Sequence, residues 1–379
     1  MPDKHAILSA SSSHRWIECP PSALLCSRAE NQSSPYAKQG TDAHALCEYK
    51  VLRALGRDAK DPTEDLDYFD AEMDDCTDQY CQYVIEQLQE ARALCADPQI
   101  QIEQRLDFSE WVPQGFGTGD CLIIADRVLH IIDFKYGLGV IVEADHNPQM
   151  MCYALGALGT YDGIYDITEI RLTIFQPRRA NISTWTVSKE DLLSWAETTL
   201  RPAAELAIRG KGEFKAGDHC RFCAVKATCR KRAEHNLELT LFDFAPPAEL
   251  DTEEIAEILP RIDELISWAE DIKDYALQSA LSGTHYPGFK VVEGRSTRRF
   301  TDEAAVAETV SLHGYDPYER KLLGITAMTQ LLGRKQFDEL LGGLITKPPG
   351  KPALVPETDK RPPINTAKED FDDNSQMNR

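Results

Sequence analysis

Hydrophobic positions that recur every three to four residues mark the first part of the chain as mostly helical. This spacing predicts helices over 40–56, with a start signal at Thr41, and over 78–95. Further along, short apolar runs rich in β-branched residues replace the helical period. They predict strands at 99–108 and in both halves of 117–137, and another at 169–177.

Two further helices are predicted between and after these strands. One begins at 147, where Asn147 is a suitable N-cap and Pro148 suits the first helical position. The other covers 188–210 and opens with a Ser188/Asp191 variant of the capping box. This order of helices and strands predicts an α/β fold.

Beyond residue 235 the pattern changes again. Residues 250–281 and 302–345 have helical spacing, and a small strand region is expected within 288–300. The last segment contains six prolines and few apolar residues. We therefore expect a core over 1–235, a mostly helical C-terminal region over 236–345 and a Pro-rich disordered tail over 346–379.

The composition indicates a cytoplasmic protein without a membrane span. No run approaches the ~20 uncharged apolar residues that a spanning helix requires, and no secretory signal opens the chain. Eleven cysteines in such a protein indicate thiols and metal ligands rather than disulfides. The net charge of −21 argues against nucleic acid as a partner, but ten acidic residues lie within 58–78, whereas 220–234 carries five Lys or Arg. The charge therefore does not exclude DNA.

The apolar strand pair in 117–137 contains two aspartates and a lysine. If Asp126 and Arg127 form a two-residue turn, Asp120 and Asp133 lie opposite each other, with Cβ atoms about 4.5–5.5 Å apart. Like charges so placed destabilise a bare sheet, and Lys135 falls on the same face as Asp133. Two carboxylates and an ammonium suit Mg²⁺-assisted attack on a phosphate. The alternative is a strand-start residue and a solvated sheet face, and the spacing alone does not decide.

This strand pair resembles the core of the PD-(D/E)xK nucleases. The segment 117–120 ends in the first acid, and Asp133-Phe-Lys135 follows on the next strand. The family's Pro-Asp form is replaced by Gly-Thr-Gly-Asp, a variation that resembles the RecB-like branch. The resemblance implies a restriction-endonuclease-like fold, in which a mixed sheet is flanked by helices, and a metal bound by Asp120 and Asp133, with Lys135 assisting the nucleophilic water.

Two helices extend the resemblance. His44 closes a G-x-x-x-H motif at 40–44, similar to that of the RecB-like branch, whose histidine binds the metal. Gln149 and Tyr153 reproduce that branch's Q-x-x-x-Y helix, and as an i,i+4 pair they project from one helix face. The resemblance therefore adds His44 to the Mg²⁺ or Mn²⁺ ligands and gives Gln149 and Tyr153 a role in positioning DNA. Glu103, on the preceding strand, is a further candidate ligand or structural partner.

The spacing Cys220-x₂-Cys223-x₅-Cys229 is typical of a metal site, and a closed four-thiolate site needs one more cysteine. Iron–sulfur members of the RecB-like nucleases take one cysteine before the histidine motif and three after the core. By resemblance, Cys19 completes a [4Fe–4S] site, with Cys26 as a rival. Zinc in the same sulfurs and metal-free thiols remain alternatives.

The resemblance implies a metal-dependent DNA nuclease, an exonuclease of recombination, repair or replication. The whole chain, including the segment at 350–362, looks like an uncharacterised phage and prophage family. Analogy then suggests a bacterial host cell and a phage single-strand annealing or single-strand binding protein as partner. The rival hypotheses are a catalytically inactive nuclease-fold module that binds DNA or serves as an iron–sulfur or zinc scaffold, and a zinc-stapled scaffold whose acidic surface binds protein.

Overall fold

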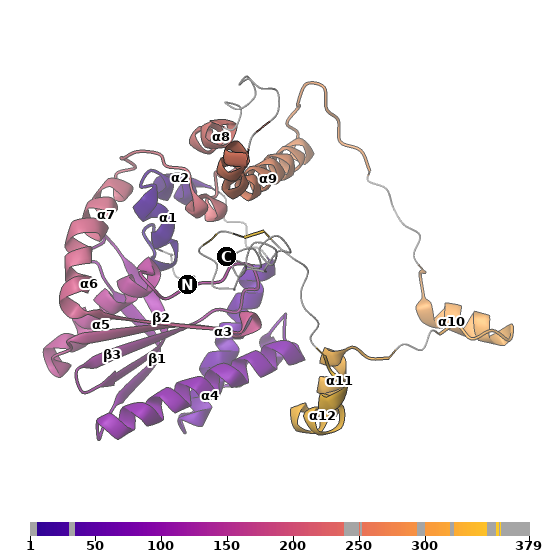
Figure 1. Cartoon of the computed structure of the whole chain (residues 1–379), viewed down its shortest axis with the longest axis horizontal. Coiled ribbons are helices and arrows are strands. Elements are labelled where there is room, and N and C mark those ends of the chain that lie inside the picture. Colours follow the sequence, from indigo (N-terminus) through magenta and orange to yellow (C-terminus); the bar gives the residue numbers. More distant parts are fainter. Residues whose placement is uncertain are drawn as a thin grey trace, which may run out of the picture. The chain divides into compact units, whose positions relative to one another are not determined.

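The structure is a computed structural model with two compact units, Met1–Ser279 and Ala280–Arg379. The first unit is built on a five-stranded sheet with helices on both faces (Figure 1). The predicted α/β class, a mixed sheet flanked by helices, is confirmed. The structure describes residues 6–29, 35–238, 250, 252–293, 300–318, 322–346, 354–355 and 357.

The strands follow one another in the sheet in chain order, β1-β2-β3-β4-β5. Neighbouring strands are antiparallel except β3 and β4, which are parallel and are joined by helix α5. A parallel pair requires such a crossover, whereas antiparallel strands can be joined by short turns. The strands are β1 (Gln99–Asp107), β2 (Phe116–Ala125), β3 (Val128–Phe134), β4 (Glu169–Gln176) and β5 (Asn181–Ser188).

The β2–β3 hairpin has the predicted register. Ala125 pairs with Val128, so Asp126 and Arg127 form the two-residue turn. Asp126 adopts a left-handed conformation with φ 54°, which aspartate tolerates better than most residues. The ladder runs to the pair Cys121 and Ile132, one step before the two aspartates.

Helices α3 (Pro35–Ala54) and α4 (Ala71–Leu94) pack on each other and cover one face of the sheet. Asp70 caps α4 by accepting a hydrogen bond from the backbone N–H of Met73 at 2.7 Å. The buried cluster on this face includes Leu46, Val51, Tyr80, Val84, Leu88, Cys121, Ile123, Ile132 and Phe134.

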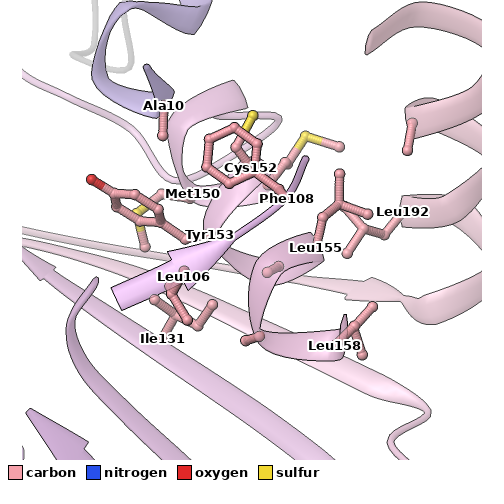
Figure 2. Packing of buried hydrophobic residues seen from close by; sticks show 14 of the residues in the cluster. Ala10, Leu106, Phe108, Ile131, Met150, Cys152, Tyr153, Leu155, Leu158 and Leu192 are labelled. Carbon is pink, nitrogen blue, oxygen red and sulfur yellow. The ribbon is translucent and has the colours of Figure 1, made fainter. Parts of the chain in front are cut away.

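Helix α5 (Pro148–Tyr165) covers the other face, with α1 (Ser13–Glu18), α6 (Lys189–Trp195) and α7 (Arg201–Ile208) in the same buried cluster (Figure 2). The predicted cap of α5 is confirmed, because the Asn147 side chain accepts from the N–H groups of Gln149 and Met150. A Cβ at Gly156 would lie 2.9 Å from the Cβ of Leu106. Glycine therefore permits α5 to approach β1 closely.

The predicted helical C-terminal region is confirmed. Helices α8 (Arg230–Leu237) and α9 (Thr252–Leu281) are joined by the fully buried Arg232, whose guanidinium pairs with Glu264 at 2.6 Å and Asp271 at 2.5 Å. The end of the core at residue 235 stays a prediction. The second unit contains α10 (Glu303–Leu312), α11 (Ile325–Leu332) and α12 (Arg334–Leu341).

The prediction of a strand within 288–300 is wrong for the residues of this range that the structure describes. Residues 288–293 and 300 form no strand, and 294–299 lie outside the described residues. A strand is stable only beside a partner strand, and all five described strands belong to the sheet of the first unit. The Pro-rich tail predicted over 346–379 lies, apart from 346, 354–355 and 357, outside the described residues. No described helix has the length and apolar character needed to cross a bilayer.

Candidate active site

Three acidic residues line up across three neighbouring strands. In β1 and β2, Ile102 pairs with Cys121 and Gln104 with Gly119, a register that sets Glu103 opposite Asp120. The hairpin register sets Asp133 of β3 opposite Asp120 on its other side. Opposed residues of antiparallel strands point to the same side of a sheet. We call these three acids, with His44 and Lys135, the acid site.

The side chains of β1 and β2 switch from one face of the sheet to the other at this row of acids. Ile102 packs with the α3–α4 cluster, whereas Leu106 packs with the α5 cluster, although a period of two would keep them on one face. Glu103, between them, has a left-handed φ of 48°. On β2, Cys121 belongs to the α3–α4 cluster, but a Cβ at Gly117 would meet the Tyr153 ring of α5. The change of face explains how helices from both layers reach the same acids.

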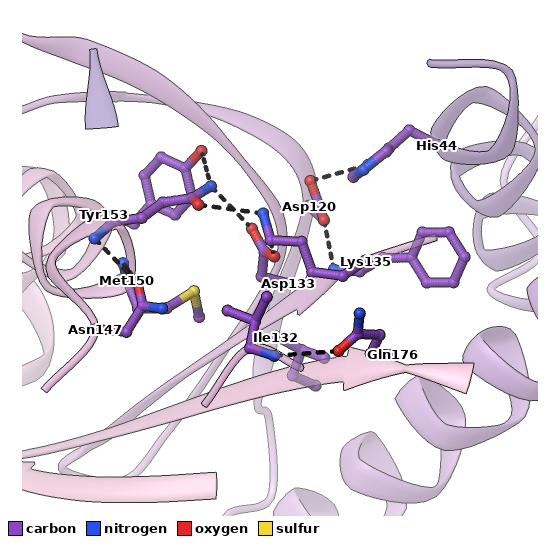
Figure 3. Close-up of polar contacts among 12 residues, drawn as sticks. His44, Asp120, Ile132, Asp133, Lys135, Asn147, Met150, Tyr153 and Gln176 are labelled. Atoms are coloured by element: carbon purple, nitrogen blue, oxygen red, sulfur yellow. Dashed lines mark hydrogen bonds and ion pairs between the residues drawn. The ribbon is translucent and has the colours of Figure 1, made fainter. Parts of the chain in front are cut away.

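Helix α3 supplies His44. Its Nδ1 lies 3.3 Å from Oδ1 of Asp120, and its ring meets the ring of Phe134 edge-on, with the centroids 5.5 Å apart (Figure 3). The donor atoms of His44, Glu103 and Asp120 lie within 4.8 Å of one another. Among the described residues, no other group of three His, Cys, Asp or Glu donors is this compact. An imidazole and carboxylates are suitable ligands for a divalent metal ion.

Asp120 and Asp133 use their oxygens differently. Oδ2 of Asp120 accepts a 2.7 Å hydrogen bond from the backbone N–H of Phe134. Oδ1 of Asp133 accepts from Nε2 of Gln149 at 3.3 Å. Its Oδ2 lies 2.9 Å from Nζ of Lys135 as an ion pair, yet this buried oxygen has no hydrogen bond of good geometry. The Lys135 ammonium therefore offsets the cost of burying this carboxylate oxygen.

The Q-x-x-x-Y residues of α5 complete the site. Lys135 Nζ donates to Oε1 of Gln149 at 3.1 Å, and Gln149 Nε2 donates to the Tyr153 hydroxyl at 3.0 Å (Figure 3). Gln149 therefore bridges Tyr153 to both Lys135 and Asp133. The structure thus brings together all six residues that the sequence singled out here, and the roles assigned to them stay predictions.

The charges of the acid site are strongly coupled. Burial would lower the pKa of His44, but the Asp120 carboxylate raises it to about 9. Burial also opposes ionisation of Asp120, yet the histidine holds the pKa of that carboxyl below its usual value. Burial and the nearby Asp120 raise the pKa of Glu103 to about 8. At neutral pH, His44 is therefore an imidazolium that balances the negative charge of Asp120, and Glu103 is protonated and uncharged.

In the sequence, Glu103 is only a secondary candidate ligand, whereas in the structure it belongs to the compact group with His44 and Asp120. Its nearness to Asp120 depends on the β1–β2 register, and β1 and β2 are joined by eight residues, 108–115. A connection of that length does not set a register, unlike the two-residue turn between β2 and β3. The sequence signal was therefore only an acid in the middle of a strand.

Four cysteines line one small cavity of about 20 Å³. Cys19 ends α1, Cys220 lies in the short helix Asp218–Phe222, Cys223 follows that helix, and Cys229 caps α8. These are the four cysteines predicted to share a site, and we call them, with Cys26, the cysteine site. Sγ of Cys26 lies 3.7 Å from Sγ of Cys223, and it accepts the backbone N–H of Ala224 at 3.3 Å.

No three of the cysteine sulfurs that the structure describes form a compact group of the size that one zinc ion would bind. In a tetrahedron with Zn–S bonds of ~2.3 Å, neighbouring sulfurs lie about 3.8 Å apart. Within the described part of the chain, no three cysteine sulfurs lie within 4.8 Å of one another. Arg15 and Lys226 also line the cavity, so cations are available to offset thiolate charge.

Comparison with known proteins gives a family without an assigned activity. The model of the family described as "Protein of unknown function (DUF2800)" matches residues 5–362. A solved structure, "Crystal structure of SSO0001", is similar at 11% sequence identity, over 58% of this chain and 96% of that chain, with a TM-score of 0.23. A TM-score this low carries no argument about fold or function.

Proposed function

The chain belongs to the DUF2800 family, and we propose that this member is a metal-dependent DNA nuclease of the RecB-like PD-(D/E)xK type. It hydrolyses phosphodiester bonds as an exonuclease in phage or prophage DNA recombination, repair or replication, in the cytoplasm of the bacterial host. A phage single-strand annealing or single-strand binding protein is the partner proposed by analogy.

One observation carries the proposal: the donor atoms of His44, Glu103 and Asp120 lie within 4.8 Å of one another, beside the buried carboxylate of Asp133. A divalent cation in this site would compensate for the negative charges of the Asp120 and Asp133 carboxylates. The residues present therefore fit Mg²⁺ or Mn²⁺, held by His44, Asp120 and Asp133 with Glu103 as a further ligand, and binding of the ion would release the protons of His44 and Glu103. When bound, such an ion polarises the phosphate and lowers the pKa of a bound water.

Lys135 acts as a cation in this scheme. Burial would lower the pKa of its ammonium, but the carboxylates of Asp133 and Asp120 raise it above its usual value. Lys135 therefore remains protonated, so it orients the attacking water and stabilises negative charge on the phosphate rather than serving as the base. Its contact with Gln149 at 3.1 Å fixes the direction of Nζ.

Gln149 and Tyr153 position the substrate strand beside the acids. Burial and the charge of Asp133 raise the pKa of Tyr153, so its hydroxyl stays protonated and can donate to a phosphate oxygen. The amide of Gln149 is already shared between Lys135 and Asp133. Gln149 therefore links Tyr153, which contacts the DNA strand, to the amine of Lys135.

We also propose a [4Fe–4S] cluster bound by Cys19, Cys220, Cys223 and Cys229, because these four cysteines line one cavity and follow the order of the cluster ligands in the iron–sulfur RecB-like nucleases. The cluster ties the N-terminal helices to the segment after the core. The protein purified without oxygen is expected to be brown and to contain iron and inorganic sulfide. A colourless protein with one zinc per chain would reject this part of the proposal.

The nuclease proposal is tested by cleavage of labelled DNA with Mg²⁺. The wild type, Asp133→Ala and Lys135→Ala are compared, with Glu90→Ala, an exposed acid of α4, as the matched control. We expect cleavage by the wild type and the control only. Equal activity in all four proteins would reject the site, and DNA binding without cleavage by any of them would favour the inactive binding module instead.

A further inference from the structure

The loop between β3 and α5 has candidate active-site residues at both ends. It leaves the sheet directly after Lys135 and Tyr136, and it ends at the cap of α5, two residues before Gln149. Its tip exposes three aliphatic side chains: Leu138 is 48% exposed, Val140 40% and Ile141 47%. Exposed apolar groups gathered in this way usually mark a surface that contacts something.

The tip is held in this exposed position by its backbone. The amide of Gln176, 1% exposed at the end of β4, donates to the carbonyls of Gly137 at 2.8 Å and Val140 at 2.9 Å, and it accepts the N–H of Val142 at 3.2 Å. Asn181 donates to the carbonyl of Val142 at 2.9 Å. Because buried polar groups fix the loop on both sides of its apolar tip, the exposure is part of the built structure.

The short stretch of chain between the tip and Lys135, the proposed catalytic amine, keeps the two close together. Leu138 lies three positions after Lys135, so their Cα atoms are at most about 11 Å apart. Since base pairs rise by ~3.4 Å, this distance spans about three base pairs. A DNA strand whose phosphate meets Lys135 therefore has neighbouring bases within reach of the tip.

The chemistry of the tip selects bases rather than phosphates. Residues 137–142, GLGVIV, carry no charge, whereas phosphate contacts are made by Arg, Lys and polar groups. Aliphatic side chains presented on a fixed backbone can insert against a base step and unstack it. Building on the proposed function, we infer that this loop is an apolar wedge that packs on the terminal base pair of duplex DNA and separates it beside the acid site.

The inference is tested with a variant that removes the apolar tip and leaves the loop backbone intact. This variant combines Leu138→Ser, Val140→Ser and Ile141→Ser, because the hydrogen bonds from Gln176 and Asn181 go to main-chain atoms. The matched control is Ile164→Ser, a 73% exposed isoleucine at the far end of α5. All proteins also carry Asp133→Asn, so that binding is measured without cleavage.

The readout is the fluorescence of 2-aminopurine in the terminal base pair of a blunt duplex, which rises when the base unstacks. We expect the control to raise the fluorescence and the triple variant to leave it unchanged. With Asp133 restored, the triple variant should cleave the blunt duplex about tenfold more slowly than the control, because the wedge no longer offsets part of the cost of unstacking the terminal step. Both proteins should cleave single strands at the same rate.

Equal fluorescence increases in the control and the triple variant would overturn the wedge, and so would the absence of any increase in both. A change of oligomeric state in the triple variant, with no effect at the DNA end, would also overturn it and identify the tip as a contact between copies of the chain. If the control unpairs the end but the restored proteins cleave no DNA, the proposed function fails while the wedge stands.

Discussion

The acid site and the cysteine site are both assembled from segments far apart in the chain, but they are held in different ways. In the acid site, the ladders of β1, β2 and β3 set the positions of the three acids. A hydrogen bond from the backbone of Phe134 then orients Asp120, and Gln149 orients Asp133 and Lys135. The sheet and helix α5 therefore position these groups through hydrogen bonds within the protein.

The cysteine site has no such scaffold. Cys220 and Cys223 lie in and after a five-residue 3₁₀ helix, and the backbone bonds there are turn contacts, such as Cys223 N–H to the Cys220 carbonyl at 3.0 Å. Cys19 comes from the opposite end of the first unit's sequence. The sheet itself therefore preorganises the acid site, whereas a bound metal group would have to hold the cysteine site together. Four measurements test this difference.

The largest expected effect is the loss of hydrolysis in Asp133→Asn without loss of stability. The amide of Asn has the shape of the Asp133 side chain, and its Oδ1 can still accept from Gln149. The Asp120 carboxylate continues to stabilise the Lys135 ammonium, so the fold should tolerate the change. We expect the cleavage rate to fall about a thousandfold or more, equivalent to about 4 kcal/mol, while the free energy of unfolding from urea denaturation stays within about 1 kcal/mol of wild type. A large loss of stability would show that the acid site is not preorganised.

The next largest effect is a loss of stability, which we expect for Cys229→Ser. Removing a ligand releases the connection between Cys19 and the segment after the core, a loop of about two hundred residues. By analogy with cross-links that close long loops, we expect unfolding in urea to become easier by about 3 kcal/mol. Cys95→Ser, a half-buried cysteine beyond α4, is the control. Equal stability of the two variants would mean that no bound metal group cross-links the cysteine site.

The third and smaller effect is a loss of stability at acidic pH, which arises in the sheet that carries the acid site. His130 of β3 is buried beside Thr173, and burial, with some repulsion from Arg171, lowers its pKa to about 3. The unfolded chain therefore binds a proton that the folded protein rejects, so stability is fully present above pH ~6.5 and is lost as the pH falls from there towards 3. At pH 5 the loss is about 2 kcal/mol.

His130→Gln should remove this part of the acid sensitivity, because the amide can keep the contact with Thr173 without titrating. Urea unfolding of the wild type and His130→Gln at pH 7 and pH 5 gives the comparison. If both proteins lose the same stability between these pH values, His130 is not the titrating group and the sheet is less acid-sensitive than its buried histidine suggests.

The smallest effect tests how firmly α5 holds the acid site. Asn147→Ala removes the N-cap of α5, and Ser188→Ala removes the N-cap of α6. Each should destabilise the protein by about 1 kcal/mol in thermal or urea unfolding. Only Asn147→Ala should also slow cleavage, because Gln149 lies in the first turn of α5. Equal cleavage rates would show that Gln149 is positioned by the sheet rather than by its cap.

The parts of the fold and site that could be predicted are those with local causes. The two-residue turn at Asp126 and Arg127 determined the hairpin register, and with it the placement of Asp120 opposite Asp133. The cap at Asn147 determined where α5 begins and therefore which face carries Gln149 and Tyr153. The wrong expectation of a strand within 288–300 shows the limit of this reasoning, because a strand pattern says nothing about a partner.

The α/β core, the two acids across a hairpin and the cysteine triplet follow from the local sequence, since periodicity, caps and tight turns act over a few residues. Tertiary packing brings Glu103 to His44 and Asp120, and it places Cys19 in the cavity with the triplet and Cys26 beside Cys223. These contacts join segments whose connections are too long to fix a geometry, so they depend on the packing of both helix layers against the sheet.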